Sequence, residues 1–440
     1  MPRRRPATTP TARRRRPRAS SRTPRGARLT DTDAADAQAA AALLTSAAVR
    51  ERAGMIYAAG LRGDLAHFDV RPDKLDACAR FVAETIRANY PALKVPPHAR
   101  WRHLGANGRD WAERLSPHLS GEPLERARQR IDLAVTSVLL DAGAGRHWRW
   151  RDPVTGRDFA RSEGLALASL EAFRAGLFSS DPARPARADA EGLAQVSEAR
   201  LAEVFQVGGD NPLVGIEGRA ALLRRLGRQI AEHPQVYGAA PRVGGLVDHL
   251  LGSAAGVGVA LPHVLAIILT TLGPMWSGRL TLGGIALGDT WQHSAVVVPG
   301  PTNGLVPFHK LSQWLTYSLV EPVEDAGIAV RDLDGLTGLA EYRNGGLFLD
   351  MGVIALRDPA LAGEPLTPDQ EPIVEWRALT VALLDAIAPL VRREIGVSAE
   401  AMPLASVLEG GTWSAGRRIA QSLRADGGPP LNIVSDGTVF

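Results

Sequence analysis

The sequence of 440 residues contains a single cysteine, Cys78, and this scarcity limits the chemistry that the chain can carry. One thiol excludes a disulfide framework and any zinc site built from cysteines, and it is typical of a protein of the reducing cytoplasm. The ten histidines are scattered, and no two have the i, i+4 spacing of a helical zinc motif. The sequence therefore predicts a cytoplasmic protein without a metal site.

Other common signatures are also missing. No phosphate-binding loop with Gly-Lys-Ser/Thr occurs, no serine lies in a nucleophile elbow, and strands do not alternate with helices. Gly143-Ala144-Gly145 is too short for a dinucleotide loop and has no strand before it. Residues 251–276 carry no charge, but two prolines and four glycines interrupt them, and Val264–Leu272 is too short to cross a bilayer. The sequence therefore predicts a buried helix here and no membrane partner.

Positive charge is concentrated in one part of the chain. Residues 1–28 contain eleven arginines and no acid, whereas the remaining chain has 40 lysines and arginines against 47 acids, a net charge of −7. A domain that binds nucleic acid normally has a basic face of its own, so nucleic acid is not an expected partner. We interpret residues 1–31 as a disordered arginine-rich tail, which leaves a contact arm, a transit-like segment or a non-functional extension open.

Apolar residues recur at helical spacing through much of the remaining chain. The pattern predicts a helix over residues 125–140, where Ile131, Val135 and Val138 share one face, and further helices from Pro307 to about Ile395. Short β-hairpins are predicted over residues 147–162 and 279–291, each across a glycine-containing turn. We therefore expect a single mainly α domain over residues 32–440, with one or two short β-hairpins.

Three polar clusters lie in otherwise apolar sequence. They are Phe308-His309-Lys310, Glu341-Tyr342-Arg343-Asn344 and Glu375-Trp376-Arg377. Burying an unpaired carboxylate or guanidinium costs several kcal/mol, so such charges need partners. The clusters therefore predict one polar pocket, in which Glu341, Lys310, Arg343 and Glu375 converge. A basic corner with several carboxylates suits a small, phosphorylated, sugar-like ligand.

Two of these clusters allow more than one interpretation. Lys310 is one of only three lysines, against 48 arginines, which favours a need for a compact point charge such as a phosphate clamp. A lysine at the rim of an apolar helix over residues 307–319 is the alternative. Glu341 and Arg343 could form a structural ion pair, or belong to a site with Glu375 and Arg377 at the start of the helix from Ala378.

Several longer motifs are distinctive. They are residues 137–145, Arg161-Ser162-Glu163-Gly164-Leu165-Ala166, residues 178–181, 304–319, 339–346 and 373–380, Leu408-Glu409-Gly410-Gly411-Thr412-Trp413, and residues 435–440. With these motifs, the chain resembles the uracil catabolism protein four family over about residues 40–440. The resemblance implies a pyrimidine pathway in which uracil becomes a nucleotide, its ring is opened and urea is released.

A more distant resemblance is to queuosine salvage proteins, which hydrolyse the N-glycosidic bond of a nucleoside 5′-monophosphate. It rests on residues 211–227, Phe308-His309-Lys310, residues 336–343 and Val374-Glu375-Trp376-Arg377. The resemblance implies their helical, DNA glycosylase-like fold, and it places their catalytic aspartate on Glu341. Glutamate is longer by one methylene, so its carboxylate reaches about 1.5 Å further, and the ribose or the attacking water must lie differently.

Together, these resemblances imply an N-ribosyl hydrolase that acts on a ribosylurea or related pyrimidine-derived ribose 5-phosphate. Glu341 is the expected catalytic residue, and water is the only co-substrate, so no cofactor is expected. The alternative is a non-catalytic nucleotide-binding or scaffolding subunit, and a homo-oligomer is left open in both cases. Lys310 and Arg343 are expected to hold the phosphate, Asp141 and Glu163 to contact urea or ribose hydroxyls, and Tyr342, Glu375, Arg377 and His309 to complete the substrate-binding set.

Overall fold

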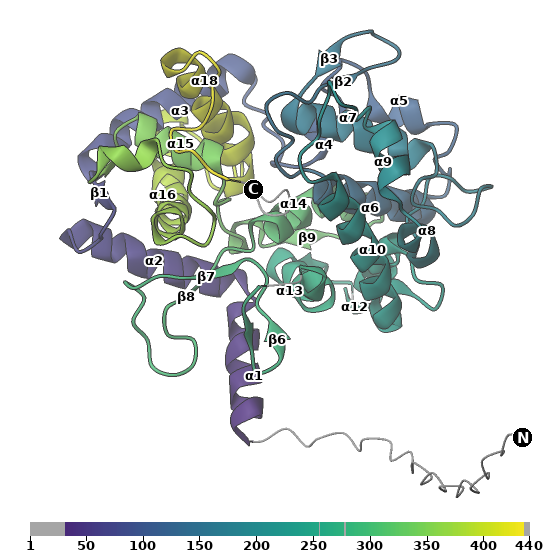
Figure 1. Cartoon of the computed structure of the whole chain (residues 1–440), viewed down its shortest axis with the longest axis horizontal. Coiled ribbons are helices and arrows are strands. Elements are labelled where there is room, and N and C mark those ends of the chain that lie inside the picture. The colour runs from purple at the N-terminus through teal and green to yellow at the C-terminus, as the bar shows by residue number, and fades with distance from the viewer. Residues whose placement is uncertain (1–30, 255, 277–278, 435–440) are drawn as a thin grey trace, which may run out of the picture.

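The computed structural model describes residues 31–254, 256–276 and 279–434, and its fold is mainly α, as the sequence predicts. The predicted arginine-rich tail, apart from its last residue, and the motif at residues 435–440 lie outside the described residues. Helix α14 (Lys310–Asp325) lies in the middle of the molecule, between two groups of helices (Figure 1). The first group contains α2 (Ser46–Arg62), α3 (Leu75–Asn89), α15 (Tyr342–Asp350), α16 (Glu371–Ile395) and α18 (Trp413–Leu423).

The second group contains the helix predicted over residues 125–140, which is α6 (Pro123–Leu139). Its buried face packs along α14, and it ends before a loop at residues 140–145. The other helices of this group are α4 (Trp101–Leu104), α5 (Trp111–Leu115), α7 (Arg161–Arg174), α8 (Ala190–Ala194), α9 (Glu198–Val204), α10 (Ile216–Glu232), α11 (Pro234–Tyr237) and α12 (Leu246–Ser253).

Three helices complete the α structure: α1 (Asp31–Leu43), α13 (Leu261–Leu272) and α17 (Leu404–Ser406). Helix α13 is the buried helix expected within the uncharged stretch, and Pro262 stands in its first turn, where a missing N–H is tolerated. Among the described residues, no helix is long and apolar enough to cross a membrane.

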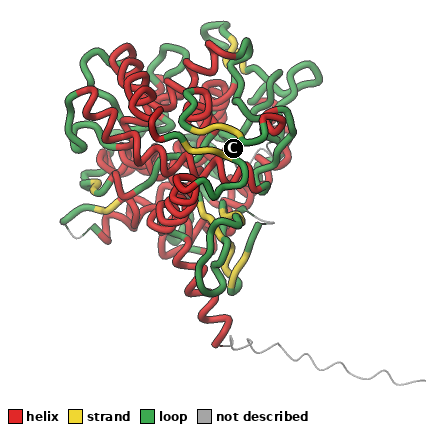
Figure 2. The backbone as a smooth tube through the Cα atoms, turned by 90° about the vertical axis from the view of Figure 1, so that its left-hand side faces the viewer, coloured by secondary structure: helices red, strands yellow, loops and turns green. Residues whose placement is uncertain are grey.

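Strands are short, and within the described residues they pair only two by two, as Figure 2 shows. Both predicted hairpins are confirmed, as β2 (Trp150–Arg151) with β3 (Asp158–Phe159) and as β5 (Thr281–Leu282) with β6 (Ile285–Ala286). The other pairs join distant segments. They are β1 (Phe68–Val70) with β10 (Ile354–Leu356), β4 (Val259–Ala260) with β9 (Val330–Arg331), the one parallel pair, and β7 (Thr290–Gln292) with β8 (Leu305–Pro307).

The helix predicted to begin at Pro307 begins three residues later, at Lys310. Pro307 instead ends strand β8, and His309 turns the chain into the helix with a φ of 47°. A residue with a left-handed backbone conformation changes the direction of the chain, so the side chain that follows does not continue the alternation of the strand. This turn places Lys310 at the N-terminus of α14, in which 13 of the 16 residues are buried.

Helices α15 and α18 approach each other closely because of one glycine. A Cβ on Gly416 would lie 2.1 Å from the carbonyl oxygen of Arg343, which is inside van der Waals contact. Only glycine therefore allows α18 to lie against the first turn of α15. This contact brings the segment before α18 next to the cluster that begins at Glu341.

Candidate functional site

A cavity of about 620 Å³ opens between the two groups of helices. Its walls are the loop after α6, the N-terminal ends of α7, α14 and α15, and the C-terminal segment over residues 426–433. Several arginines hold this segment in place: Arg343 donates to the carbonyl oxygen of Gly427 at 2.8 Å, and Arg161 donates to that of Asp426 at 3.1 Å. Five of the predicted site residues line the cavity directly: Asp141, Lys310, Glu341, Tyr342 and Arg343.

Lys310 is a buried cation that faces this cavity. The residue is 9% exposed, and its Nζ lies 5.8 Å from the centre of the Trp314 ring. Among the described residues, no hydrogen-bond acceptor or carboxylate binds that Nζ. Burial lowers the pKa of Lys310, and the negative charges of Glu341 and Asp141 only partly oppose the effect. A buried ammonium without a partner is able to bind an anionic ligand.

Glu341 is the N-cap of α15. Its two carboxylate oxygens accept hydrogen bonds from the backbone N–H groups of Arg343 at 2.9 Å and Asn344 at 2.7 Å. The side chain is therefore fixed at the positive end of the helix, where a carboxylate is favoured. The side chains of Glu341 and Arg343 do not form the ion pair that the sequence left open. The Arg343 guanidinium instead binds Gly427 and lies over the Tyr342 ring.

Asp141 faces Lys310's cavity from the loop after α6. Its Oδ1 lies 3.0 Å from Nη1 of Arg100, which is fully buried. Burial raises the pKa of Asp141, but the charges of Arg100, His103 and Lys310 outweigh it and hold the pKa below its usual range. Arg219 of α10 fixes the loop itself by donating to the carbonyl oxygens of Leu140, Ala142 and Gly143.

Glu163 lies just outside the cavity wall, next to Ser162, which lines it. Its carboxylate forms an ion pair with Arg417 of α18. Burial raises the pKa of Glu163, and the charge and hydrogen bond of Arg417 more than offset the increase. Glu163 therefore links the two groups of helices at the edge of the cavity, and its expected contact with substrate stays a prediction.

The third cluster does not reach this cavity, so the prediction of one pocket shared with Glu375 is wrong. Helix α16 begins at Glu371, seven residues earlier than expected, so Glu375 lies one turn inside the helix, among its buried residues. Glu375 is fully buried and accepts hydrogen bonds from the N–H groups of His67 and Phe68 at 3.1 and 2.8 Å, with His293 Nε2 at 3.2 Å. These contacts join α16 to strand β1, which is a structural role.

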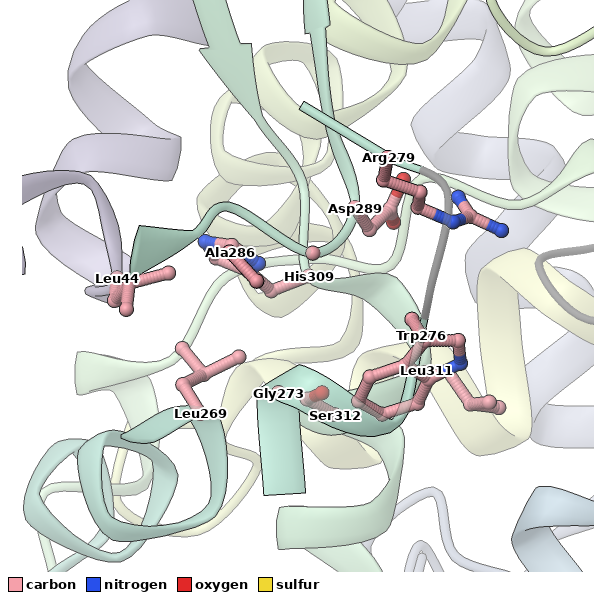
Figure 3. Close-up of a pocket in the computed structure, with 11 residues that line it drawn as sticks. Leu44, Leu269, Gly273, Trp276, Arg279, Ala286, Asp289, His309, Leu311 and Ser312 are labelled. Atoms are coloured by element: carbon pink, nitrogen blue, oxygen red, sulfur yellow. The ribbon is translucent and has the colours of Figure 1, made fainter. Parts of the chain in front are cut away.

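Arg377 and His309 also lie away from the cavity. Arg377 forms a two-pronged ion pair with Asp289 at 2.8 and 2.7 Å. His309 lines a separate, mostly apolar cavity of about 20 Å³, drawn in Figure 3 with Asp289 and Arg279 beside one another, and burial lowers its pKa. Its Nε2 is 2.9 Å from the carbonyl oxygen of Leu43. The expected binding of substrate by these two residues is therefore not supported.

The Asp289–Arg377 pair nevertheless holds two backbone segments of the site in place. Asp289 Oδ2 accepts the backbone N–H of Lys310 at 3.1 Å, and Arg377 Nε donates to the carbonyl oxygen of Ala340 at 3.3 Å. The pair thus braces the residue before Glu341 and the first residue of α14. Burial raises the pKa of Asp289, but Arg377 outweighs it and holds the pKa well below its usual range.

We expect Asp289→Asn to lower the free energy of unfolding at pH 7 by about 3–5 kcal/mol, because it leaves a buried guanidinium without its charge partner. A depressed folded-state pKa stabilises the fold above the unfolded pKa, and this contribution is lost as pH falls. The difference between the two proteins in urea unfolding should therefore stay nearly constant from pH 7 to about pH 5, and shrink as pH falls below the unfolded-state pKa of about 3.9. Asp385→Asn, which breaks the more exposed pair with Arg50, is the control and should cost less than about 1 kcal/mol. An equal loss in both variants would contradict a bracing role.

The sequence analysis missed the aromatic wall of the cavity, which consists of His98, His103, Trp314 and Trp413. The His98 ring stacks on Trp314 at 6.0 Å, and the His103 ring meets Trp314 and Trp413 edge-on at 5.8 and 5.7 Å. The Trp314 Nε1 and the His103 Nδ1 are buried without a hydrogen-bond partner among the described residues. The available signal was the group of polar residues from His98 to His103, which follows a proline-rich break.

These features define a mainly α protein with a large cavity, lined by a buried cation, two carboxylates held by their partners, and aromatic rings. The chain belongs to the family described as a protein of unknown function, DUF1688, whose model matches residues 42–440. It is 37% identical over 413 residues to Protein urg3 of Schizosaccharomyces pombe, covering 91% of this chain and 98% of that protein. It is also 37% identical over 407 residues to Uracil catabolism protein 4 of Lachancea kluyveri, covering 85% and 92%. The resemblance to the uracil catabolism protein four family is thus confirmed.

Proposed function

We propose that this chain acts in uracil catabolism as an N-ribosyl hydrolase, which cleaves a ribosylurea or related pyrimidine-derived ribose 5-phosphate into urea and ribose 5-phosphate. One observation carries the proposal: the unpartnered ammonium of Lys310 lines the same cavity as the fixed carboxylate of Glu341. An anion at Lys310 and a developing cation at Glu341 are what the two ends of a ribosyl 5-phosphate present. A relative named Uracil catabolism protein 4 supports the pathway.

The cavity suits a ligand of this class. Its volume of about 620 Å³ lies within the range of small-molecule sites. Lys310 and Arg343 line it as cations for the phosphate, and the aromatic wall offers flat surfaces for a planar ureido group. No nucleic-acid or membrane partner is part of the proposal.

Glu341 performs the central chemical task in this proposal. Breaking the N-glycosidic bond builds positive charge on C1′ and on the ring oxygen of the ribose. A carboxylate held by two backbone N–H groups needs no reorganisation as that charge grows, and preorganised groups of this kind supply several kcal/mol. Each oxygen retains a lone pair, so the carboxylate can also orient the attacking water.

The experiment that tests the function is an assay of purified protein with ribosylurea 5-phosphate as substrate. We expect urea and ribose 5-phosphate to form in equal amounts, with neither formed from the dephosphorylated ribosylurea at a comparable kcat/KM. Tight binding of the phosphorylated compound without turnover would overturn the hydrolase. It would instead favour the non-catalytic nucleotide-binding subunit, for which Glu341 has only the capping role that it has in α15.

A further inference from the structure

The segment before α18 contains a π-helical turn, Val407–Thr412, that points a carboxylate into the molecule. Such turns are rare and often lie at functional sites. Two glycines let this one pack directly on its neighbours, because a Cβ on Gly410 or Gly411 would lie 2.8 Å from a side-chain carbon of Val95 or Val82. The turn thereby places Glu409 beside the aromatic wall of the cavity.

Glu409 binds and orients His98. Its Oε2 is 2.6 Å from His98 Nδ1, and both side chains are nearly buried, at 12% and 6% exposure. The backbone N–H of His98 is also held, by the carbonyl oxygen of Ala405 at 2.9 Å. With Nδ1 donating to Glu409, Nε2 is the ring nitrogen available to a ligand, and among the described residues it has no hydrogen-bond partner. His98 lines the cavity.

His98 lies within reach of a ligand whose phosphate binds Lys310. The His98 ring centre and the Lys310 Nζ both lie within about 6 Å of the Trp314 ring, from α14. They are therefore no more than about 12 Å apart, a distance that a ribose 5-phosphate with its N-linked group can span. Trp413 lies 6.2 Å from the His98 ring, so a planar group that reaches Nε2 meets aromatic surfaces.

We propose that His98, positioned by Glu409, is a second catalytic residue, which protonates the departing nitrogen of the substrate. This inference rests on the proposed ribosyl hydrolysis and assigns the group that activates its leaving group. Glu409 is a positioning residue, since it acts through His98. A urea nitrogen leaves poorly as an anion, and a positioned general acid contributes about 10²–10⁴-fold to such a step.

The step balances as follows. The C1′–N bond breaks with its electron pair going to nitrogen, and the imidazolium of His98 gives that nitrogen the proton of Nε2. Water adds to C1′ and passes a proton to the carboxylate of Glu341, which releases it to solvent, while His98 takes a proton from solvent. The net change is one water consumed, with urea and ribose 5-phosphate formed.

The charges around His98 fit this role. Burial raises the pKa of Glu409. The hydrogen bond and the charge of His98 outweigh this effect and hold the pKa below its usual range, so Glu409 is ionised at neutral pH. Arg102 and Tyr90 are the other titratable groups beside Glu409. On the cavity side His98 faces His103, whose pKa burial and the charge of Arg100 lower to about 4. His103 is therefore neutral at pH 7 and does not compete as the acid.

The test compares two substrates with different leaving groups: ribosylurea 5-phosphate, and a nitrophenyl riboside 5-phosphate, whose phenolate leaves without a proton. We expect His98→Asn to lower kcat on ribosylurea 5-phosphate about 10²-fold, with KM nearly unchanged and the basic limb of the pH–rate profile lost. On the nitrophenyl substrate the same variant should retain most of its rate. His263→Asn, an exposed histidine on α13, is the matched control and should match the wild type on both.

A second variant keeps the test informative if the first one misfolds. Glu409→Gln retains a hydrogen-bond acceptor for His98 but removes the charge, so it should shift the basic limb and lower kcat on ribosylurea 5-phosphate only. Equal losses on both substrates, or no loss on either, would overturn the role of His98 while leaving the hydrolase intact. A wild-type protein that cleaves neither substrate would overturn the proposed function, and the role of His98 with it.

Discussion

Glu341→Gln is expected to lower kcat on ribosylurea 5-phosphate by about 10²–10⁴-fold and to leave KM largely unchanged. The amide is nearly isosteric with the carboxylate but neutral, so it cannot offset the charge that develops at C1′ or accept a proton from water. An interaction made mainly in the transition state affects kcat rather than KM when it is removed. The measurement is steady-state kinetics, combined with a melting curve of each protein.

The melting curve is needed because Glu341 also caps α15. The carboxylate accepts two backbone hydrogen bonds, and an amide has only one oxygen to accept them, so a loss of about 1 kcal/mol of stability is expected. Asp189 offers a matched control, since it is a buried N-cap that accepts from the N–H groups of Gly192 and Ser180 at 2.9 and 3.1 Å, away from the cavity. Asp189→Asn should lose at least as much stability, because it also loses an ion pair with Arg187 at 3.2 Å, and it should retain its kcat. A Glu341→Gln protein that is folded and turns over at the wild-type rate would remove Glu341 from the mechanism.

Lys310→Met is expected to lower kcat/KM for the phosphorylated substrate by about 10²-fold, because hydrogen bonds to charged groups contribute about 1.5–3 kcal/mol. The effect should be almost absent with a dephosphorylated analogue, since the lost interaction is with the phosphate. Ribose 5-phosphate should also raise the melting temperature of the wild type and leave that of the variant unchanged.

The same variant should be more stable than the wild type without ligand. Burial lowers the folded-state pKa of Lys310, so the charged lysine opposes folding, and this penalty fades as pH rises from the lowered folded-state pKa to the unfolded-state pKa. Methionine of similar length removes the penalty. Lys94→Met, at an exposed lysine, is the control for both measurements and should change neither. A Lys310→Met protein that is destabilised and still responds to ribose 5-phosphate would show that Lys310 is structural.

Much of the fold could be predicted from the sequence alone, because helices and hairpins depend on the local spacing of residues. Apolar residues at helical intervals define α6, and glycine-containing turns between short strands define both hairpins, whatever the rest of the chain does. It also pointed to the cavity through Lys310 and Glu341, since a rare lysine and an acid in apolar surroundings need a reason to be there. Asp141, by contrast, was expected only from the family resemblance.

Which polar clusters share a site depends on the packing of distant segments. Glu375 and Arg377 looked equivalent to Glu341 in the sequence, but in the fold they bind strand β1 and Asp289 instead. His98 and Glu409 are 311 residues apart, and they meet only because a π-helical turn packs tightly on its neighbours. The physical reason is that a buried charge must find a partner, and local spacing states that need without stating which distant segment meets it.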